Sequence, residues 1–146
     1  MFKSILVCTD GSPLANKAAK AGVALAKALG AKITVYRAVE SLEPIYVEGY
    51  AFDRVVIDRA EKRVREAGQK HVDAIGRMAK ASGVPFTSVV TNAISAYEGI
   101  VGAAKKQKCD VIFMASHGRR GLSRLIMGSV TQKVLTHSKI PVVVYR

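Results

Sequence analysis

The sequence predicts an α/β fold in which a parallel sheet is covered by helices on both faces. Apolar runs of strand length alternate with stretches of helix length along the whole chain. The runs are apolar at successive positions, which is typical of strands buried on both faces. At 146 residues the chain fits a single domain, residues 1–146, with one core.

The first half of the chain is expected to hold two strands and two helices. Ser12 is a suitable N-cap and Pro13 a suitable first residue for the first helix, which runs to about Leu29 and ends at Gly30. The second helix is a long amphipathic stretch whose charges fall on one outer face, and Gly83 follows it. The expected segments are a strand over 2–9, a helix over 13–29, a strand over 32–39, a loop over 40–49 and a helix over 52–81.

The second half is expected to hold three strands and two helices. Ser95 and Glu98 have the spacing of a capping box, in which the two side chains satisfy free backbone N–H groups, and they predict a helix start. The branched apolar run at 111–114 predicts a strand. The expected segments are a strand over 85–91, a helix from 95 to about 107, a strand over 110–116, a helix over 129–136 and a strand over 140–146.

The segment from Ala115 to Ser129 lies between a predicted strand and a predicted helix and is rich in glycine and arginine. Glycine lets the backbone approach a ligand, arginine donates charge-assisted hydrogen bonds, and a helix N-terminus carries partial positive charge. We therefore expect this segment to bind phosphates. The sequence has no Gly-x4-Gly-Lys-Ser/Thr pattern, which excludes a P-loop. It has no Gly-x-Gly-x-x-Gly pattern after the first strand, which disfavours an NAD site. The expected phosphate-binding residues are Gly118, Arg119, Arg120, Gly128 and Ser129.

Composition limits the partners and the location. The formal charge is +12, and residues 101–146 hold nine basic residues against one acidic residue, Asp110, which favours an anionic ligand. Nucleic acid is disfavoured because the basic residues are not interleaved with aromatic ones. Apolar stretches are shorter than a membrane span, and the chain begins without a signal-peptide pattern, so a cytoplasmic protein is expected. Cys8 and Cys109 are expected to be free thiols.

In a parallel sheet of this type, ligands bind beyond the C-terminal ends of the strands, where the strand order reverses. We therefore expect the ends of the first, second and fourth strands to share a cleft. Asp10 is a candidate for a ribose hydroxyl or for a metal held by phosphates, or it caps a turn. His117 is a less favoured candidate base, Arg37 a less favoured phosphate ligand, and His71 is expected on a helix surface. The residues expected to meet a base are Thr9, Ala38 and Met114.

These motifs resemble the universal stress protein family. Nucleotide-binding members share a Gly-x2-Gly-x9-Gly-Ser/Thr motif, and the stretch from Ala115 through Gly118 to Gly128 and Ser129 matches it everywhere but at Ala115. The resemblance also covers the first strand, around 5–12, and the last, around 140–144. It implies an adenine nucleotide alpha hydrolase-like, Rossmann-like fold with strand order 3-2-1-4-5. At Ala115 the open question is whether the added methyl meets the ligand.

The resemblance implies a stress-response protein that binds ATP or a related nucleotide, AMP or ADP, with Mg or Mn held by the phosphates and Asp10. Thr9 and Asp10 would meet adenine and ribose. A homodimer through the last strand, 142–145, is also implied, and an apolar strand at a sheet edge would favour it. The adenine pocket would contain Ala38 and Met114, and the ribose and phosphates would lie among Ala115, Gly118, Gly128, Ser129 and Val130.

Three alternatives remain open. The first is a slow metal-dependent ATP hydrolase in which Asp10 holds the metal and arginines 119, 120 and 124 stabilise the transition state. The second is a stress protein that binds no nucleotide. The third is a basic module for nucleic acid, which rests on charge alone.

Overall fold

The computed structural model describes residues 1–41, 46–47, 50–51, 53–118 and 127–146. The strands of the main sheet alternate with helices along the chain, and their order in the sheet is β5-β2-β1-β6-β7. Counted along the main sheet alone, this is the predicted order 3-2-1-4-5. The elements are β1 (Ser4–Cys8), α1 (Pro13–Leu29), β2 (Lys32–Glu40), β3 (Tyr46–Val47), β4 (Tyr50–Ala51), α2 (Arg54–Ala81), β5 (Phe86–Ala93), α3 (Ala96–Lys106), β6 (Val111–Ala115), α4 (Ser129–His137) and β7 (Val142–Tyr145).

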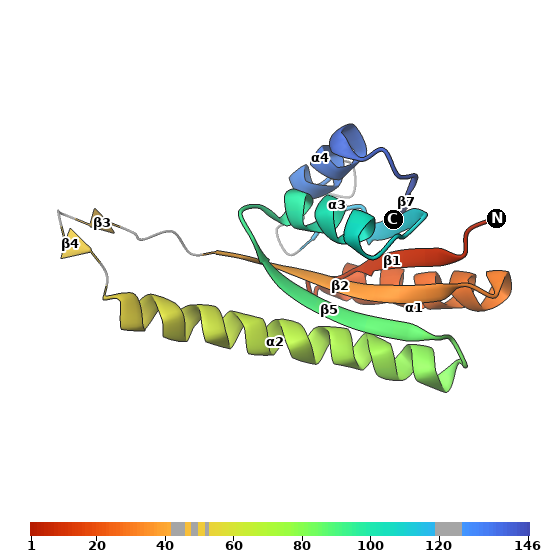
Figure 1. Cartoon of the computed structure of the whole chain (residues 1–146), viewed down its shortest axis with the longest axis horizontal. Coiled ribbons are helices and arrows are strands. Elements are labelled where there is room, and N and C mark those ends of the chain that lie inside the picture. Colours follow the sequence, from red (N-terminus) through yellow and green to blue (C-terminus); the bar gives the residue numbers. More distant parts are fainter. Residues whose placement is uncertain (42–45, 48–49, 52, 119–126) are drawn as a thin grey trace.

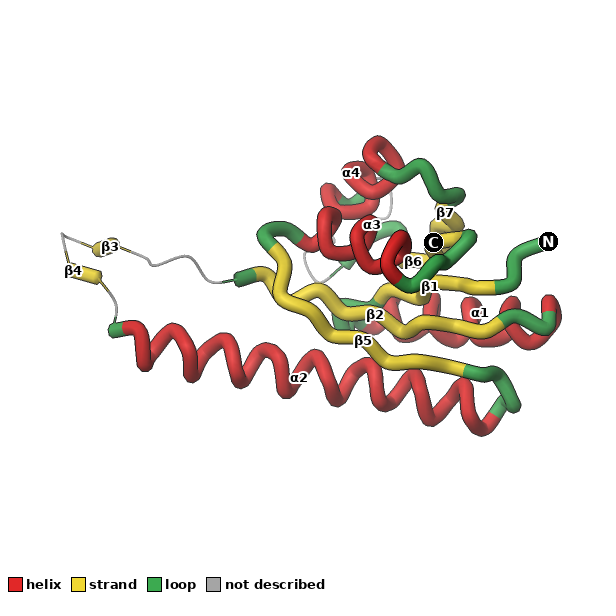
Figure 2. The backbone as a smooth tube through the Cα atoms, in the orientation of Figure 1, coloured by secondary structure: helices red, strands yellow, loops and turns green. Residues whose placement is uncertain are grey.

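The main sheet is parallel and lies between two helical layers, as predicted (Figures 1 and 2). Alternate strand residues point to opposite faces. Val7 and Val35 pack in the cluster under α1 and α2, whereas Leu6 and Tyr36 pack in the cluster under α3 and α4. Both clusters are apolar and buried, which explains why the central strands are apolar at successive positions.

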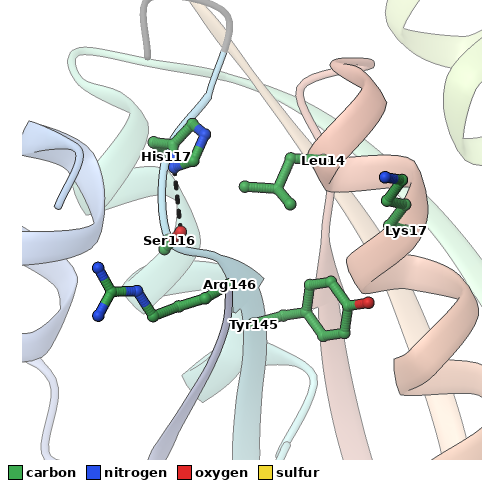
Figure 3. Close-up of a pocket in the computed structure, with 6 residues that line it drawn as sticks. All are labelled: Leu14, Lys17, Ser116, His117, Tyr145 and Arg146. Atoms are coloured by element: carbon green, nitrogen blue, oxygen red, sulfur yellow. Dashed lines mark hydrogen bonds between the residues drawn. The ribbon is translucent and has the colours of Figure 1, made fainter. Parts of the chain in front are cut away.

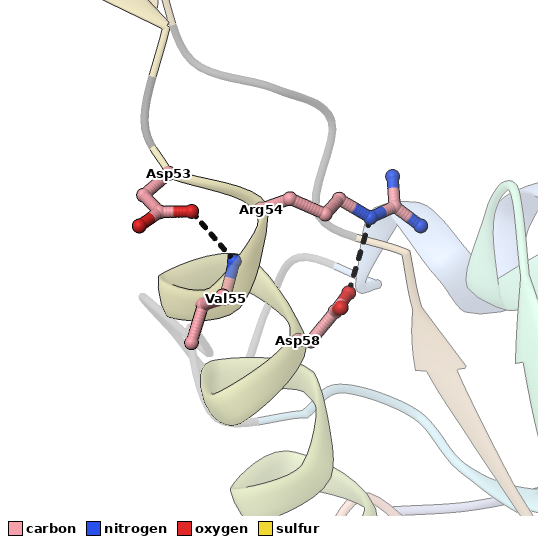
Figure 4. A network of polar contacts seen from close by, with 4 residues as sticks. All are labelled: Asp53, Arg54, Val55 and Asp58. Atoms are coloured by element: carbon pink, nitrogen blue, oxygen red, sulfur yellow. Dashed lines mark hydrogen bonds and ion pairs between the residues drawn. The ribbon is translucent and has the colours of Figure 1, made fainter.

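The two N-terminal helices begin at side-chain caps. The Ser12 hydroxyl accepts the Ala15 N–H at 3.2 Å, as expected for α1. At α2, the Asp53 carboxylate accepts the Val55 N–H at 3.1 Å, and one turn later Arg54 and Asp58 pair at 3.2 Å (Figure 4). This ion pair is exposed and contributes little. Each cap satisfies a backbone donor that the first helical turn leaves free.

Two local predictions were wrong. The segment 40–49 was expected to be a loop, but β2 extends to Glu40 and the short strands β3 and β4 pair antiparallel within 46–51. The capping box was also wrong, because the Ser95 hydroxyl donates to the Glu98 carboxylate at 3.0 Å and caps no backbone group. The Ala96 N–H instead donates to Glu40 at 2.9 Å. A carboxylate from a neighbouring strand thus replaces the local cap.

The start of the sheet is held by one carboxylate. Asp110 accepts the N–H groups of Lys3 at 2.7 Å and Ser4 at 3.1 Å, and so links β1 to the turn before β6. Cys8 and Cys109 are buried free thiols, as expected. Burial raises the pKa of the Cys8 thiol well above its usual value. Among the described residues, no helix has the length and apolar character needed to cross a membrane.

Candidate functional site

The turn after β1 meets the turn after β6 at the C-terminal edge of the sheet. Asp10 accepts the Ser12 N–H at 2.9 Å, which fixes its carboxylate, and Gly11 N–H donates to the Thr9 hydroxyl at 3.1 Å. The second carboxylate oxygen of Asp10 lies directly against Gly118, where any side chain would collide with it. Two predicted site residues from distant parts of the chain are therefore brought together.

The start of α4 folds back onto the end of β6. The Gly128 N–H donates to the Ser116 carbonyl at 2.8 Å, and a side chain at Gly128 would lie 3.1 Å from the His117 backbone. Gly128 is the N-cap, so the exposed Ser129 is the first residue of α4. The Thr131 hydroxyl donates to the Ala115 carbonyl at 3.0 Å. The glycine therefore allows a helix N-terminus to approach the sheet edge closely, as an anion site requires.

Ala38 and Met114 pack with the cluster on the α3 and α4 face of the sheet, and Val130 packs there too. A side chain at Gly99 of α3 would lie 3.2 Å from the Ala38 methyl. Ala115 belongs to the opposite cluster, beneath α1 and α2, and is 9% exposed. The Ala115 methyl thus points into the core on the face opposite Ala38 and Met114.

Two further residues contact the turn that follows β1. Arg37 of β2 donates to the Thr9 carbonyl at 3.4 Å. His71 was expected on an exposed helix surface, and this was wrong: the half-buried imidazole packs directly against the α-carbon of Gly11. Gly11 has φ 78°, in the left-handed region. The signal in the sequence was the glycine in the turn after the first strand. A residue without a side chain lets another side chain, here that of His71, come close to the backbone.

A cavity of about 470 Å³ opens beside these turns (Figure 3). The Ser116 hydroxyl and the His117 Nδ1 lie 3.0 Å apart on one side of it. Lys17 comes from α1 and Arg146 follows β7, so the cavity lies on the α1 side of the sheet. It is therefore distinct from the face that holds Ala38 and Met114. The lining residues are Leu14, Lys17, Ser116, His117, Tyr145 and Arg146.

The structure thus places nine of the predicted site residues at this edge of the sheet: Thr9, Asp10, Ala38, Met114, Ala115, Gly118, Gly128, Ser129 and Val130. Arg119 and Arg120 lie outside the described residues. Thr9 is buried, its N–H donating to the Tyr36 carbonyl at 3.0 Å. Among the described residues, no group of three or more His, Cys, Asp or Glu side chains is placed to hold a metal ion.

Solved structures of similar fold include ligand complexes. The universal stress protein UspA from Lactobacillus plantarum has a TM-score of 0.85, with 20% identity over 99% of this chain and 97% of that one. A universal stress protein in complex with cAMP has a TM-score of 0.73, with 19% identity over 99% and 97%. One from Archaeoglobus fulgidus in complex with dAMP has a TM-score of 0.63, with 14% identity over 99% and 98%.

Sequence comparison identifies the family. A universal stress protein from Thermus aquaticus is 34% identical over 146 residues, covering 100% of both chains. The universal stress protein YxiE from Bacillus subtilis is 31% identical over 150 aligned positions, also covering 100% of both. The sequence profile of the Universal stress protein family matches residues 1–146. With its five-stranded parallel sheet, this chain therefore belongs to the universal stress protein family.

Proposed function

We propose that this chain binds ATP or a related adenine nucleotide, AMP or ADP, and acts in the cytoplasm as a regulator or interaction protein of the stress response. The approach of Asp10 to Gly118 carries the proposal. It joins a fixed carboxylate, suited to ribose hydroxyls, to a backbone without a side chain, suited to phosphates. The site lies at the C-terminal edge of the sheet, where such folds bind ligands.

The proposed phosphate site is formed by Gly118, Gly128 and Ser129. Gly128 allows the N-terminus of α4 to come close to the sheet edge, and the exposed Ser129 begins that helix. Both the free backbone donors of the first turn and the helix dipole favour an anion there. Two universal stress proteins of similar fold have been solved with cAMP and with dAMP, which supports an adenine nucleotide as the ligand class.

Ala115 does not argue against this proposal. Its methyl packs in the cluster beneath α1 and α2, whereas the proposed adenine pocket, with Ala38 and Met114, lies on the other face. Its carbonyl accepts the Thr131 hydroxyl, which ties the strand end to α4. The Ala115 methyl, which departs from the family motif, therefore packs in the core and not against the proposed ligand.

A bound Mg or Mn ion would have to share its coordination between protein and nucleotide. Asp10 is the carboxylate at this edge that adjoins the proposed phosphate site, and its Oδ1 already accepts the Ser12 N–H. Mg commonly uses one or two carboxylates together with phosphates and water. The donor set therefore fits a metal that arrives with the nucleotide, where it would neutralise phosphate charge.

The proposed partner is a second copy of the chain, paired through β7. This strand is at the edge of the main sheet and contacts β6 on one side. The carbonyl of Pro141 accepts the Ile112 N–H of β6, and the carbonyl of Tyr145 accepts the N–H of Ser116, which follows β6. Val142 and Val144 therefore direct their backbone groups outward. An apolar edge strand with outward N–H and C=O groups favours pairing between chains.

Mass spectrometry of gently purified protein tests nucleotide binding most directly. We expect a co-purified adenine nucleotide, or a concentration-dependent rise in melting temperature when ATP, ADP or AMP is added. Asp10→Ala should weaken the response, whereas Lys20→Gln on the exposed surface of α1 should leave it unchanged. Absence of both a co-purified nucleotide and any rise in melting temperature would refute the proposal.

The dimer is tested by sedimentation at several protein concentrations. Val144→Pro removes an outward N–H and should convert dimers to monomers, because proline cannot complete the ladder between chains. Val144→Thr keeps the N–H and should remain dimeric. A wild-type chain that sediments as a monomer at all concentrations tested would contradict the pairing.

A further inference from the structure

The turns that end α1, α2 and α3 have the same hydrogen bonds. In each, the second residue of the turn donates to a carbonyl five residues earlier: Ala31 to Ala26 at 2.9 Å, Val84 to Ala79 at 2.9 Å and Cys109 to Ala104 at 2.8 Å. The residue before each donor has positive φ. It is Gly30 (62°) after α1 and Gly83 (72°) after α2, but Lys108 (52°) after α3. One of three equivalent positions therefore holds a lysine.

Lys108 lies where glycine is strongly favoured. The left-handed region brings a β-carbon too close to the backbone, and glycine avoids this cost. The described residues contain no other positive-φ residue besides glycines. The turn needs a left-handed residue, but glycine would serve, as it does after α1 and α2. A lysine at this strained position therefore indicates a role for its side chain. Here that side chain is an exposed ammonium group.

Lys108 belongs to a larger group that we call the lysine face. Eight exposed lysines lie at the N-terminal ends of the strands or in the last helical turns that precede them, at the right of Figure 1 for β1, β2 and β5. The Asp110 carboxylate also lies at this end, and it accepts two backbone N–H groups. The lysine face comprises Lys3, Lys27, Lys32, Lys80, Lys105, Lys106, Lys108 and Lys139.

Helix dipoles do not account for the lysine face. The four helices all end on this side, and each C-terminus carries a partial charge of about −0.5, or about two negative charges in all. Such charges act only within the last turn and are screened by salt. Lys3, Lys32 and Lys139 lie on strand-leading segments rather than in helices. The face therefore keeps a large positive excess.

We propose that the lysine face docks on the surface of an anionic phospholipid bilayer. The lysines come from both helical layers and from the leading ends of the strands, so they spread over two dimensions, which suits a surface better than a rod. The last helical turns and the strand starts carry lysines, which act as point charges, whereas arginines suit paired contacts to nucleic acid. The exposed Arg77 lies just before the last turn of α2. Phe86, 39% exposed at the start of β5, packs its ring against Gly76 of α2, so the lysines supply the attraction.

This docking is independent of the proposed nucleotide site. Asp10 and Gly118 lie at the opposite end of the strands from the lysine face. A chain docked through its lysines would therefore present the nucleotide edge to the solvent. Vesicle binding and nucleotide binding should consequently be additive, and loss of one should leave the other unchanged.

Co-sedimentation with vesicles tests the docking. We expect the full chain to bind equimolar phosphatidylcholine and phosphatidylglycerol vesicles at low salt, to be released by added salt, and to ignore phosphatidylcholine alone. Replacing one lysine at each of three helix ends, K27Q/K80Q/K106Q, should weaken binding about a hundredfold, or roughly fivefold per lysine. The matched control K20Q/K62Q/K70Q removes the same charge from mid-helix surfaces of α1 and α2 and should weaken binding less than about threefold.

Lys108→Gly separates a structural role from a binding role. Glycine relieves the left-handed backbone, so the melting temperature should rise by about 3 °C while vesicle affinity falls about fivefold. A purely structural lysine would change stability without changing vesicle affinity, and that result would overturn the proposal. So would equal losses in the two triple variants, failure to bind anionic vesicles at low salt, or tighter binding to duplex DNA or RNA than to the vesicles at matched phosphate concentration.

Discussion

Both ends of the main sheet carry turns that contain glycine, but these glycines meet different neighbours. At the C-terminal end, glycines are crowded: Gly11 lies against His71 and Gly118 lies against the Asp10 carboxylate. At the N-terminal end, a side chain at Gly30 or Gly83 would meet nothing within 4 Å. Crowded glycines indicate places where a side chain from another part of the chain comes close to the backbone. Open glycines serve only the backbone conformation.

The difference shows why a glycine must be judged with its surroundings. Lys108 occupies the turn position that Gly30 and Gly83 fill elsewhere, because there is room for a side chain at that end of the sheet. At the C-terminal end the corresponding freedom is absent, since the space beside Gly11 and Gly118 is already filled. A charged side chain can therefore replace glycine at the N-terminal end of the sheet, whereas packing requires glycine at the C-terminal end.

The largest expected effect is that of Gly11→Ala. The substitution combines a left-handed φ of 78° with a collision against the His71 imidazole, so we expect the free energy of unfolding to fall by about 3 kcal/mol. Chemical denaturation measures it. Gly30→Ala is the matched control, because it has a similar φ of 62° and open space, and it should cost only about 1 kcal/mol. Equal losses would show that His71 packing is unimportant.

Gly118→Ala should act on ligand affinity more than on stability. The new methyl would displace the Asp10 carboxylate, so affinity for adenine nucleotide should fall at least about tenfold by calorimetry. Gly102→Ala, in α3, is the control because nothing lies within 4 Å of its added methyl, and it should leave affinity unchanged. Unaltered affinity in Gly118→Ala, with wild-type binding established, would remove Asp10 and Gly118 from the site.

Ala115→Gly restores the family motif and should nevertheless leave ligand affinity within about twofold of wild type. The methyl packs in the core beneath α1 and α2, so its loss should lower the free energy of unfolding by about 1 kcal/mol. Calorimetry and denaturation on the same samples separate the two effects. A large gain in affinity would place the methyl against the ligand instead.

The smallest expected effect concerns Tyr36 at alkaline pH. Burial raises the pKa of the Tyr36 hydroxyl, which shares a 2.7 Å hydrogen bond with Thr91. The folded state therefore holds this proton more tightly than the unfolded state, and stability falls as pH rises above about 10. Tyr36→Phe should cost about 1 kcal/mol at neutral pH and reduce this decline. An unchanged decline in stability between neutral and alkaline pH would contradict it.

The fold could be predicted because its signals are local. Apolar runs and caps such as Ser12 depend on neighbouring residues, and the order of the strands followed from the family resemblance. The cap of α3 was missed because its acceptor is Glu40, 56 residues away. His71 was missed for the same reason, since only the packing of α2 brings it to Gly11. The roles proposed for the site residues stay predictions until a ligand is measured.

The carboxylate of Asp110 has a consequence for how the chain folds. It holds the backbone of Lys3 and Ser4, 107 and 106 residues earlier, and β1 lies between β2 and β6 at the centre of the sheet. β1 therefore acquires its second neighbour only after more than 100 further residues have been synthesised. Such distant pairing slows folding. We expect the native sheet to form only after β6 has been synthesised, and β1 and β2 to stay partly ordered until then.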